Sequence, residues 1–161
     1  MWIEFSELPE NARIWVYPAN RKLTEVECDE IAVKAKQFLT QWTAHGAALE
    51  ASSIIKYNRF LILGLNQDIA AASGCSIDAS VRFIQDLERT YTISLLDKMN
   101  VTFYSGQYLA HKPLDAFKKM AQNKSVSADT VVFNNLVQTK SELETHWEVP
   151  AKASWHSRFF K

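Results

Sequence analysis

The segment over residues 59–65, Arg-Phe-Leu-Ile-Leu-Gly-Leu, is apolar on both faces that an extended chain presents. A strand of this composition is typical of the interior of a sheet, where other parts of the protein cover both faces. A second β-rich segment over residues 53–57 precedes it, and the two meet near Asn58. The pair therefore predicts neighbouring strands, with residues 59–65 at the centre of the sheet.

Two amphipathic helices are predicted on either side of these strands in the sequence. Thr24 and Glu27 have the spacing of a capping box, in which each side chain bonds the other residue's backbone N–H. The apolar residues of this first helix recur at helical spacing up to a stop at His45-Gly46, and they are Cys28, Ile31, Ala35, Phe38 and Trp42. A second helix starts at Ser73 or Ser76, and its apolar positions are Ile77, Val81, Ile84, Leu87 and Tyr91.

Residues 13–17 and 101–104 complete the order strand, helix, strand, strand, helix, strand. This order predicts an α+β fold with a ferredoxin-like split βαβ core, which is an antiparallel sheet with helices on one face. We expect a single domain over residues 1–161, with a C-terminal extension. Residues 107–111 form either a hairpin with 101–104 or one long strand with a glycine bulge. From Glu148 onward we expect an irregular tail.

The overall charge gives no reason to expect a nucleic-acid partner, because 18 Lys and Arg balance 18 Asp and Glu. The central strand also lacks the row of exposed rings by which RNA-recognition motifs stack bases. Two cysteines are too few for a disulfide scaffold or a four-cysteine zinc site. The sequence shows no signal peptide and no membrane span, so we expect a soluble protein located in the cytoplasm.

Nucleotide hydrolysis through a phosphate loop is excluded by the glycine spacing. A phosphate loop needs two glycines separated by four residues and followed by Lys and Ser or Thr. The glycines at 46, 64, 74 and 106 are never that close, and none of them precedes a lysine. The histidines at 45, 111, 146 and 156 show no metal-ligand spacing, so neither a metal site nor a cofactor is expected.

The segment Ser73–Asp78 carries the candidate nucleophile, Cys75. At a helix start a thiol lies near unpaired backbone N–H groups and the positive end of the helix dipole, which favour thiolates and bound anions. Ser73, Gly74 and Ser76 are the candidate ligand-binding residues beside it. The alternative is that Cys75 is a small buried residue at a tight turn, and this interpretation is favoured because Asp78 opposes a thiolate and no base is evident.

The C-terminal run from His146 to Phe160 is unusually rich in aromatic residues, and within it Trp155, His156 and Arg158 are further candidate ligand-binding residues. Aromatic side chains beside arginine are typical of partner hot spots and of sites that stack a ligand. The same residues also suit a tail that closes the core by docking over the sheet. Both roles are compatible with the sequence.

Four segments of the chain resemble a small Bacteroidetes family of about this length, whose members are often labelled ABC transporter ATPases. They are Met1–Phe5, Arg13–Tyr17, Gly74–Asp78 and Ser154–Phe159. The resemblance implies a family without implying an activity, because this chain lacks both the phosphate loop and an LSGGQ-like signature.

These observations predict a binding or interaction domain without a recognisable catalytic set, whose partner is a protein or a small anionic ligand. The alternative is a thiol-dependent enzyme or an anion-binding protein with its site at Ser73–Asp78. An open sheet edge further predicts a homodimer.

Overall fold

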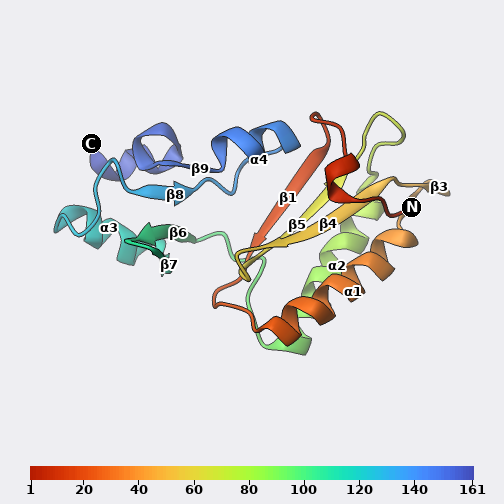
Figure 1. Cartoon of the computed structure of the whole chain (residues 1–161), viewed down its shortest axis with the longest axis horizontal. Helices are drawn as coiled ribbons and strands as arrows, with labels where there is room; N and C mark the ends of the chain where they lie inside the picture. Colours follow the sequence, from red (N-terminus) through yellow and green to blue (C-terminus); the bar gives the residue numbers. More distant parts are fainter. The chain divides into compact units, whose positions relative to one another are not determined.

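The computed structural model describes every residue from Met1 to Lys161. It combines helices with antiparallel sheets, which confirms the predicted α+β class (Figure 1). The chain forms two compact units: unit 1 holds residues 1–96 and 137–143, and unit 2 holds residues 97–136 and 144–161. The expectation that residues 1–161 fold as one domain stays a prediction.

Unit 1 is built on a three-stranded antiparallel sheet in the order β1-β5-β4, formed by β1 (Arg13–Pro18), β4 (Ala51–Lys56) and β5 (Phe60–Leu65). Every residue of β5 is buried, which confirms it as the central strand. A Cβ atom at Gly64 would lie 2.5 Å from Leu8 Cδ1, so a larger residue there would have to displace the Leu8 side chain. The short helix η1 (Phe5–Glu7) precedes β1.

The order β1-β5-β4 matches the expected split βαβ layout for its first three strands, but the fourth strand does not join this sheet. The free edge of β1 is taken instead by Gln138 and Thr139: Ile14 donates its backbone N–H to the Gln138 carbonyl (2.9 Å), and Arg13 forms an isolated antiparallel β-bridge with Thr139. The expected fourth strand lies in the sheet of unit 2 instead.

Two helices cover one side of the unit 1 sheet, α1 (Glu25–Thr40) and α2 (Gly74–Tyr91) (Figure 1). The predicted capping box of Thr24 and Glu27 is present at the start of α1. That helix ends at Thr40, before the predicted stop, and His45 and Gly46 lie beyond it with positive φ angles (52° and 79°). They form the turn of a small hairpin between β2 (Thr43–Ala44) and β3 (Ala47–Ala48).

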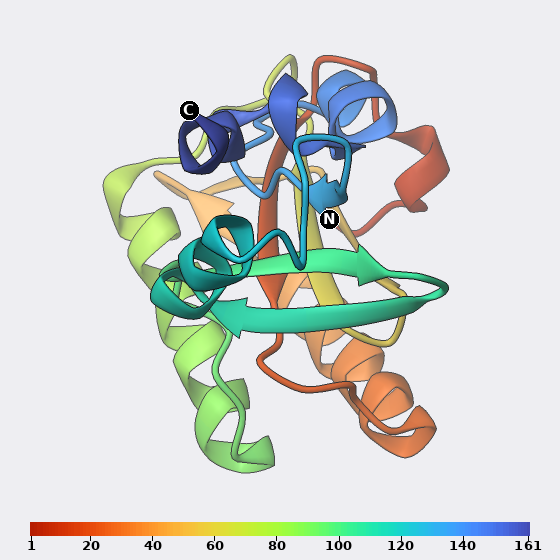
Figure 2. The ribbon, with the colours of Figure 1, turned by 90° about the vertical axis from the view of Figure 1, so that its left-hand side faces the viewer.

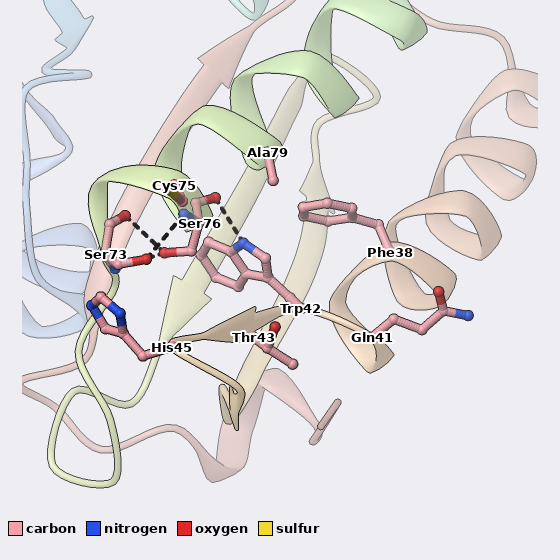
Figure 3. A pocket seen from close by; sticks show the side chains of 9 residues that line it. All are labelled: Phe38, Gln41, Trp42, Thr43, His45, Ser73, Cys75, Ser76 and Ala79. Atoms are coloured by element: carbon pink, nitrogen blue, oxygen red, sulfur yellow. Dashed lines mark hydrogen bonds between the residues drawn. The ribbon is translucent and has the colours of Figure 1, made fainter.

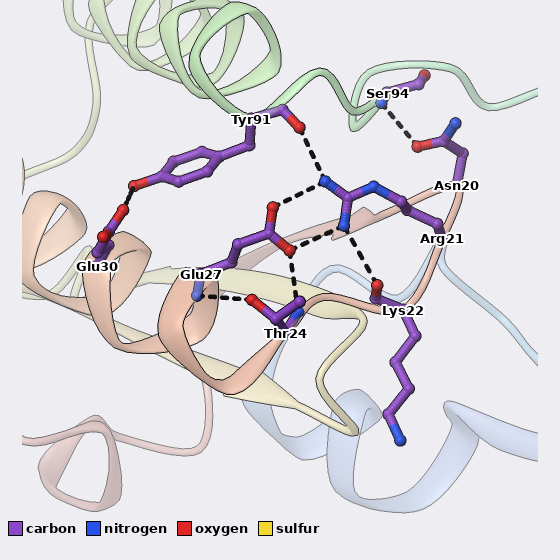
Figure 4. A network of polar contacts seen from close by, with 8 residues as sticks. All are labelled: Asn20, Arg21, Lys22, Thr24, Glu27, Glu30, Tyr91 and Ser94. Carbon is purple, nitrogen blue, oxygen red and sulfur yellow. Dashed lines mark hydrogen bonds and ion pairs between the residues drawn. The ribbon is translucent and has the colours of Figure 1, made fainter.

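A polar network joins the start of α1 to the end of α2 (Figure 4). Both terminal nitrogens of Arg21 donate to the Glu27 carboxylate at 2.8 Å, and one of them also donates to the Tyr91 carbonyl. The Thr24 backbone N–H donates to the same carboxylate at 2.9 Å. These bonds, first from Arg21 and then from Thr24, lower the pKa of Glu27 to about 2.

Unit 2 contains a four-stranded antiparallel sheet in the order β7-β6-β8-β9, whose strands are β6 (Asn100–Ser105), β7 (Tyr108–Pro113), β8 (Val131–Phe133) and β9 (Glu148–Pro150). The strands β6 and β7 form the hairpin that was one of the two predicted forms, with Gly106 at φ 63° in its turn (Figure 2). Helix α3 (Leu114–Gln122) contacts this hairpin and buries Phe117 completely. Helix α4 (Lys140–His146) precedes β9.

The C-terminal segment is ordered, so the expectation of an irregular tail is wrong. After β9 it forms two 3-10 helices, η2 (Ala151–Ala153) and η3 (Trp155–Phe160). The rings of Phe159 and Phe160 meet the Phe117 ring edge-on, with centroids 5.5 and 6.1 Å away. The aromatic residues of the tail therefore complete the core of unit 2, as predicted for a docking tail.

None of the helices has an apolar stretch long enough to span a bilayer.

Candidate functional site

A pocket of about 530 Å³ opens at the start of α2, and all of its lining residues belong to unit 1 (Figure 3). They come from the end of α1, the β2–β3 hairpin and the first turns of α2, and they are Phe38, Gln41, Trp42, Thr43, His45, Ser73, Cys75, Ser76 and Ala79. The structure thus brings the start of α2, with Ser73, Cys75 and Ser76, together with a segment about 30 positions earlier in the chain. That segment runs from Phe38 to His45.

Ser73 caps α2, and its partner in a reciprocal capping box is Ser76. The Ser76 N–H donates to Ser73 Oγ (3.1 Å), and the Ser73 N–H donates to Ser76 Oγ (2.7 Å). Ser76 Oγ in turn donates to the Ser73 carbonyl (2.8 Å). Because Ser76 is buried and its hydroxyl is fully engaged, it shapes the helix start, whereas the Ser73 hydroxyl proton remains available to a ligand.

Cys75 is exposed and unpaired on the first turn of α2, so the favoured prediction of a buried cysteine is wrong. The physical reason is that the cap is made by the two serines on either side of it, and this places the thiol on the outer surface of the turn. Gly74 has open space around its Cα. The N–H groups of Gly74 and Cys75 have no acceptor within the helix, because they belong to its first turn.

The second cysteine, Cys28, has a contrasting environment. It is half-buried on α1 and packs against the core of unit 1, as predicted. Burial raises the pKa of the Cys28 thiol, and the neighbouring carboxylates of Glu25, Asp29 and Glu27 raise it further. Cys28 is therefore a packing residue, and it is a natural internal reference for the reactivity of Cys75.

One wall of the pocket is aromatic. The Trp42 indole is buried and donates its Nε1–H to the Ser76 carbonyl at 2.8 Å, which fixes the ring against the start of α2. Phe38 lies against Trp42, with ring centroids 5.9 Å apart, and stacks on Phe83 at 4.7 Å. These rings offer apolar surface beside the polar groups of Ser73 and Cys75.

His45 lines the pocket, whereas the sequence indicated only that it ends a helix. It lies at the tip of the β2–β3 hairpin, and its exposed imidazole points toward Ser73 (Figure 3). No hydrogen bond joins it to Cys75. The spacing of 30 residues between the two carries no motif, and only the pairing of β2 with β3 places the imidazole here.

The remaining predicted residues, Trp155, His156 and Arg158, belong to η3 in unit 2. His156 is completely buried, and its Nδ1 lies 2.6 Å from Ser154 Oγ. Its ring stacks on Trp155 with centroids 3.8 Å apart, and its Nε2 has no hydrogen-bond partner. Burial, and then the positive charge of Arg158, lower the pKa of His156 to about 4, so the ring is neutral at pH 7.

No group of three or more His, Cys, Asp or Glu side chains is arranged to hold a metal ion. A comparison of the chain with models of known protein families, with curated proteins and with solved structures finds no match to any of them.

Proposed function

We propose that this protein is a binding protein, and that the pocket at the start of α2 takes a small molecule with an aromatic portion and a polar or anionic group. The observation that carries this proposal is that aromatic and polar side chains line the same pocket. The half-buried Phe38 ring, backed by the buried Trp42 indole, suits the apolar portion of the ligand, while the Ser73 hydroxyl and the His45 imidazole suit its polar group.

Binding is favoured over catalysis by the relation between the candidate nucleophile and the candidate base. A nucleophilic cysteine is normally activated by a base within hydrogen-bond reach, and that base is oriented by a third group. Cys75 and His45 line the same pocket without a hydrogen bond between them, and no hydrogen bond to a third residue orients His45. The pocket therefore provides contact surface rather than an assembled catalytic set.

The proposal is tested with 8-anilinonaphthalene-1-sulfonate, which combines an aromatic body with an anionic group. Ala79 lines the pocket, so Ala79→Leu fills part of it, whereas the matched control Ala32→Leu lies on the exposed surface of α1. We expect the protein and Ala32→Leu to bind the probe equally and Ala79→Leu to bind it about tenfold more weakly. Equal binding by both variants, with unchanged circular dichroism, would contradict the proposal.

Thiol chemistry at Cys75 is the second candidate, because the thiol is exposed in a pocket that also holds an imidazole. Iodoacetamide should label Cys75 in the native protein and reach Cys28 only after unfolding. If His45 acts as a base, His45→Ala slows the labelling of Cys75 between pH 6 and 8. A rate that is unchanged by His45→Ala would leave Cys75 as an exposed thiol without activation.

We further propose that the protein belongs to the Bacteroidetes family that it resembles and that it is located in the cytoplasm. We also propose that it forms a homodimer through a sheet edge. Sedimentation checks the homodimer, and a monomer of 18.4 kDa would contradict it.

A further inference from the structure

The two units carry opposite net charges although the whole chain is neutral. Unit 2 contains eight Lys and Arg against five Asp and Glu, a net charge of +3, and unit 1 contains ten against thirteen, a net charge of −3. The balance of the whole chain therefore conceals a basic unit. A net positive charge attracts anionic partners over roughly a Debye length, about 8 Å at physiological salt.

Arg158 is the one arginine of unit 2, and its guanidinium is held in place by two aromatic rings. Its Cζ lies 5.0 Å from the centroid of the Trp155 ring and 5.1 Å from that of Phe159. Contacts of this length are stabilising cation–π interactions. They orient the planar guanidinium without using its N–H donors, all of which lie at its edge.

The rings beneath Arg158 are themselves fixed by the core of unit 2. Trp155 stacks on the buried ring of His156, and Phe159 meets the buried Phe117 ring edge-on at 5.5 Å. Arg158 is exposed above this support. A long side chain that is already ordered loses less conformational entropy on binding than a free one, so its hydrogen bonds contribute more to affinity.

The guanidinium of Arg158 lacks an acidic partner within the chain. It forms no ion pair and no hydrogen bond, although Lys152 on the preceding helix η2 is paired with Asp129 at 2.7 Å. An exposed arginine that rests on two rings, with its donors unused, presents the planar fork that bonds a carboxylate in bidentate geometry. Arginine and tryptophan are also the residue types most enriched in interaction hot spots.

We propose that the surface formed by Trp155, Arg158 and Phe159 binds an acidic segment of a partner protein, and that Arg158 receives a carboxylate of that segment. A single-stranded nucleic acid is the weaker match, because such binding relies on aromatic faces on which bases stack. Here the Trp155 ring already stacks on the buried His156 ring and also lies against the Arg158 guanidinium, so less of it is left for a base to stack on.

The experiment titrates the full chain with acetylated, amidated hexaglutamate and follows the Arg158 Nε–H and Trp155 indole N–H signals by NMR. The matched variants are Arg158→Gln and Lys98→Gln, since each removes one exposed positive charge of unit 2. Arg158→Lys keeps the charge and removes the planar fork. Hexathymidylate serves as a nucleic-acid probe of similar charge.

We expect both Arg158 and Trp155 signals to shift with hexaglutamate, and affinity to fall about tenfold in Arg158→Gln, the effect of losing one charge-assisted pair. Arg158→Lys should bind more weakly than the unmodified protein, and Lys98→Gln should bind as well as it does. The proposal is overturned if hexaglutamate does not bind, if Arg158→Gln and Lys98→Gln lose affinity equally, or if hexathymidylate binds more tightly than hexaglutamate.

Discussion

Acidification should destabilise this protein through His156 before its carboxylates become protonated. His156 is completely buried on η3 and faces the rings of Trp155 and Phe117, the Ser154 hydroxyl and the cation of Arg158. Burial, and then Arg158, lower its pKa from 6.5 to about 4 in the folded state. Because the folded pKa is depressed, the stability that neutral His156 contributes is present above pH 6.5 and is lost as the pH falls toward 4.

The magnitude follows from the pKa difference between the unfolded and folded states. A difference of one pKa unit corresponds to about 1.4 kcal/mol, so a change from 6.5 to about 4 corresponds to about 3 kcal/mol in total. Between these pH values, the free energy of unfolding should fall with a slope approaching 1.4 kcal/mol per pH unit. Below pH 4 the folded protein is protonated as well, and the loss through His156 should level off.

Urea unfolding at several pH values between 7.5 and 4.5, followed by tryptophan fluorescence, measures this loss. His156→Gln removes the titrating group and serves as the reference, because all other ionisable groups are common to both proteins. The variant is expected to be less stable at pH 7.5 and to have a flatter pH profile. Parallel pH profiles for the two proteins would refute the reasoning, since they would show that His156 takes up its proton equally in the folded and unfolded states.

Three further substitutions test the architecture by urea unfolding at pH 7.5. Gly64→Ala should cost about 1–3 kcal/mol, because the added Cβ lies 2.5 Å from Leu8 Cδ1 in a filled core; no loss would show that Leu8 moves freely. Ser73→Ala should cost about 1 kcal/mol by removing the N-cap of α2, whereas Ser73→Asp, which keeps an acceptor, should retain most of the stability. Lys140→Met should cost about 1–3 kcal/mol, because the buried ammonium donates to the Leu8 carbonyl at 2.8 Å. Lys56→Met is the control at an exposed lysine. Equal stability of the two variants would contradict a stabilising role for the Lys140 hydrogen bond.

The local elements of the fold were predictable because their signals are short-range. The apolar segment 60–65 is the central strand β5, and Thr24 with Glu27 forms the predicted capping box. The hairpin around Gly106 was one of two predicted alternatives. Each of these features depends on residues within a few positions of one another, so periodicity and turn chemistry are enough to find it.

The arrangement of the strands was less predictable, because it depends on competition for one sheet edge. The strand predicted at residues 101–104 was expected in one sheet with β1, but the backbone of Gln138 and Thr139 occupies the free edge of β1. Nothing in the sequence near residue 138 marks it as an extended segment that pairs over such a distance. The prediction of an irregular tail failed for a similar reason. The tail is ordered because the rings of Phe159 and Phe160 pack against Phe117, about 40 residues away in the chain, and the local sequence does not reveal this contact.

By itself the sequence determined the α+β class, the central strand, the helix caps and the candidate segment Ser73–Asp78, because these follow from local composition and spacing. Tertiary structure alone decided that Cys75 is exposed, that His45 and Trp42 share its pocket, and that His156 is buried. The physical reason is that solvent exposure and pocket lining are set by contacts between distant segments. In this chain those contacts depend on a hairpin with strands of two residues each and on a short aromatic helix, which carry almost no signal of their own.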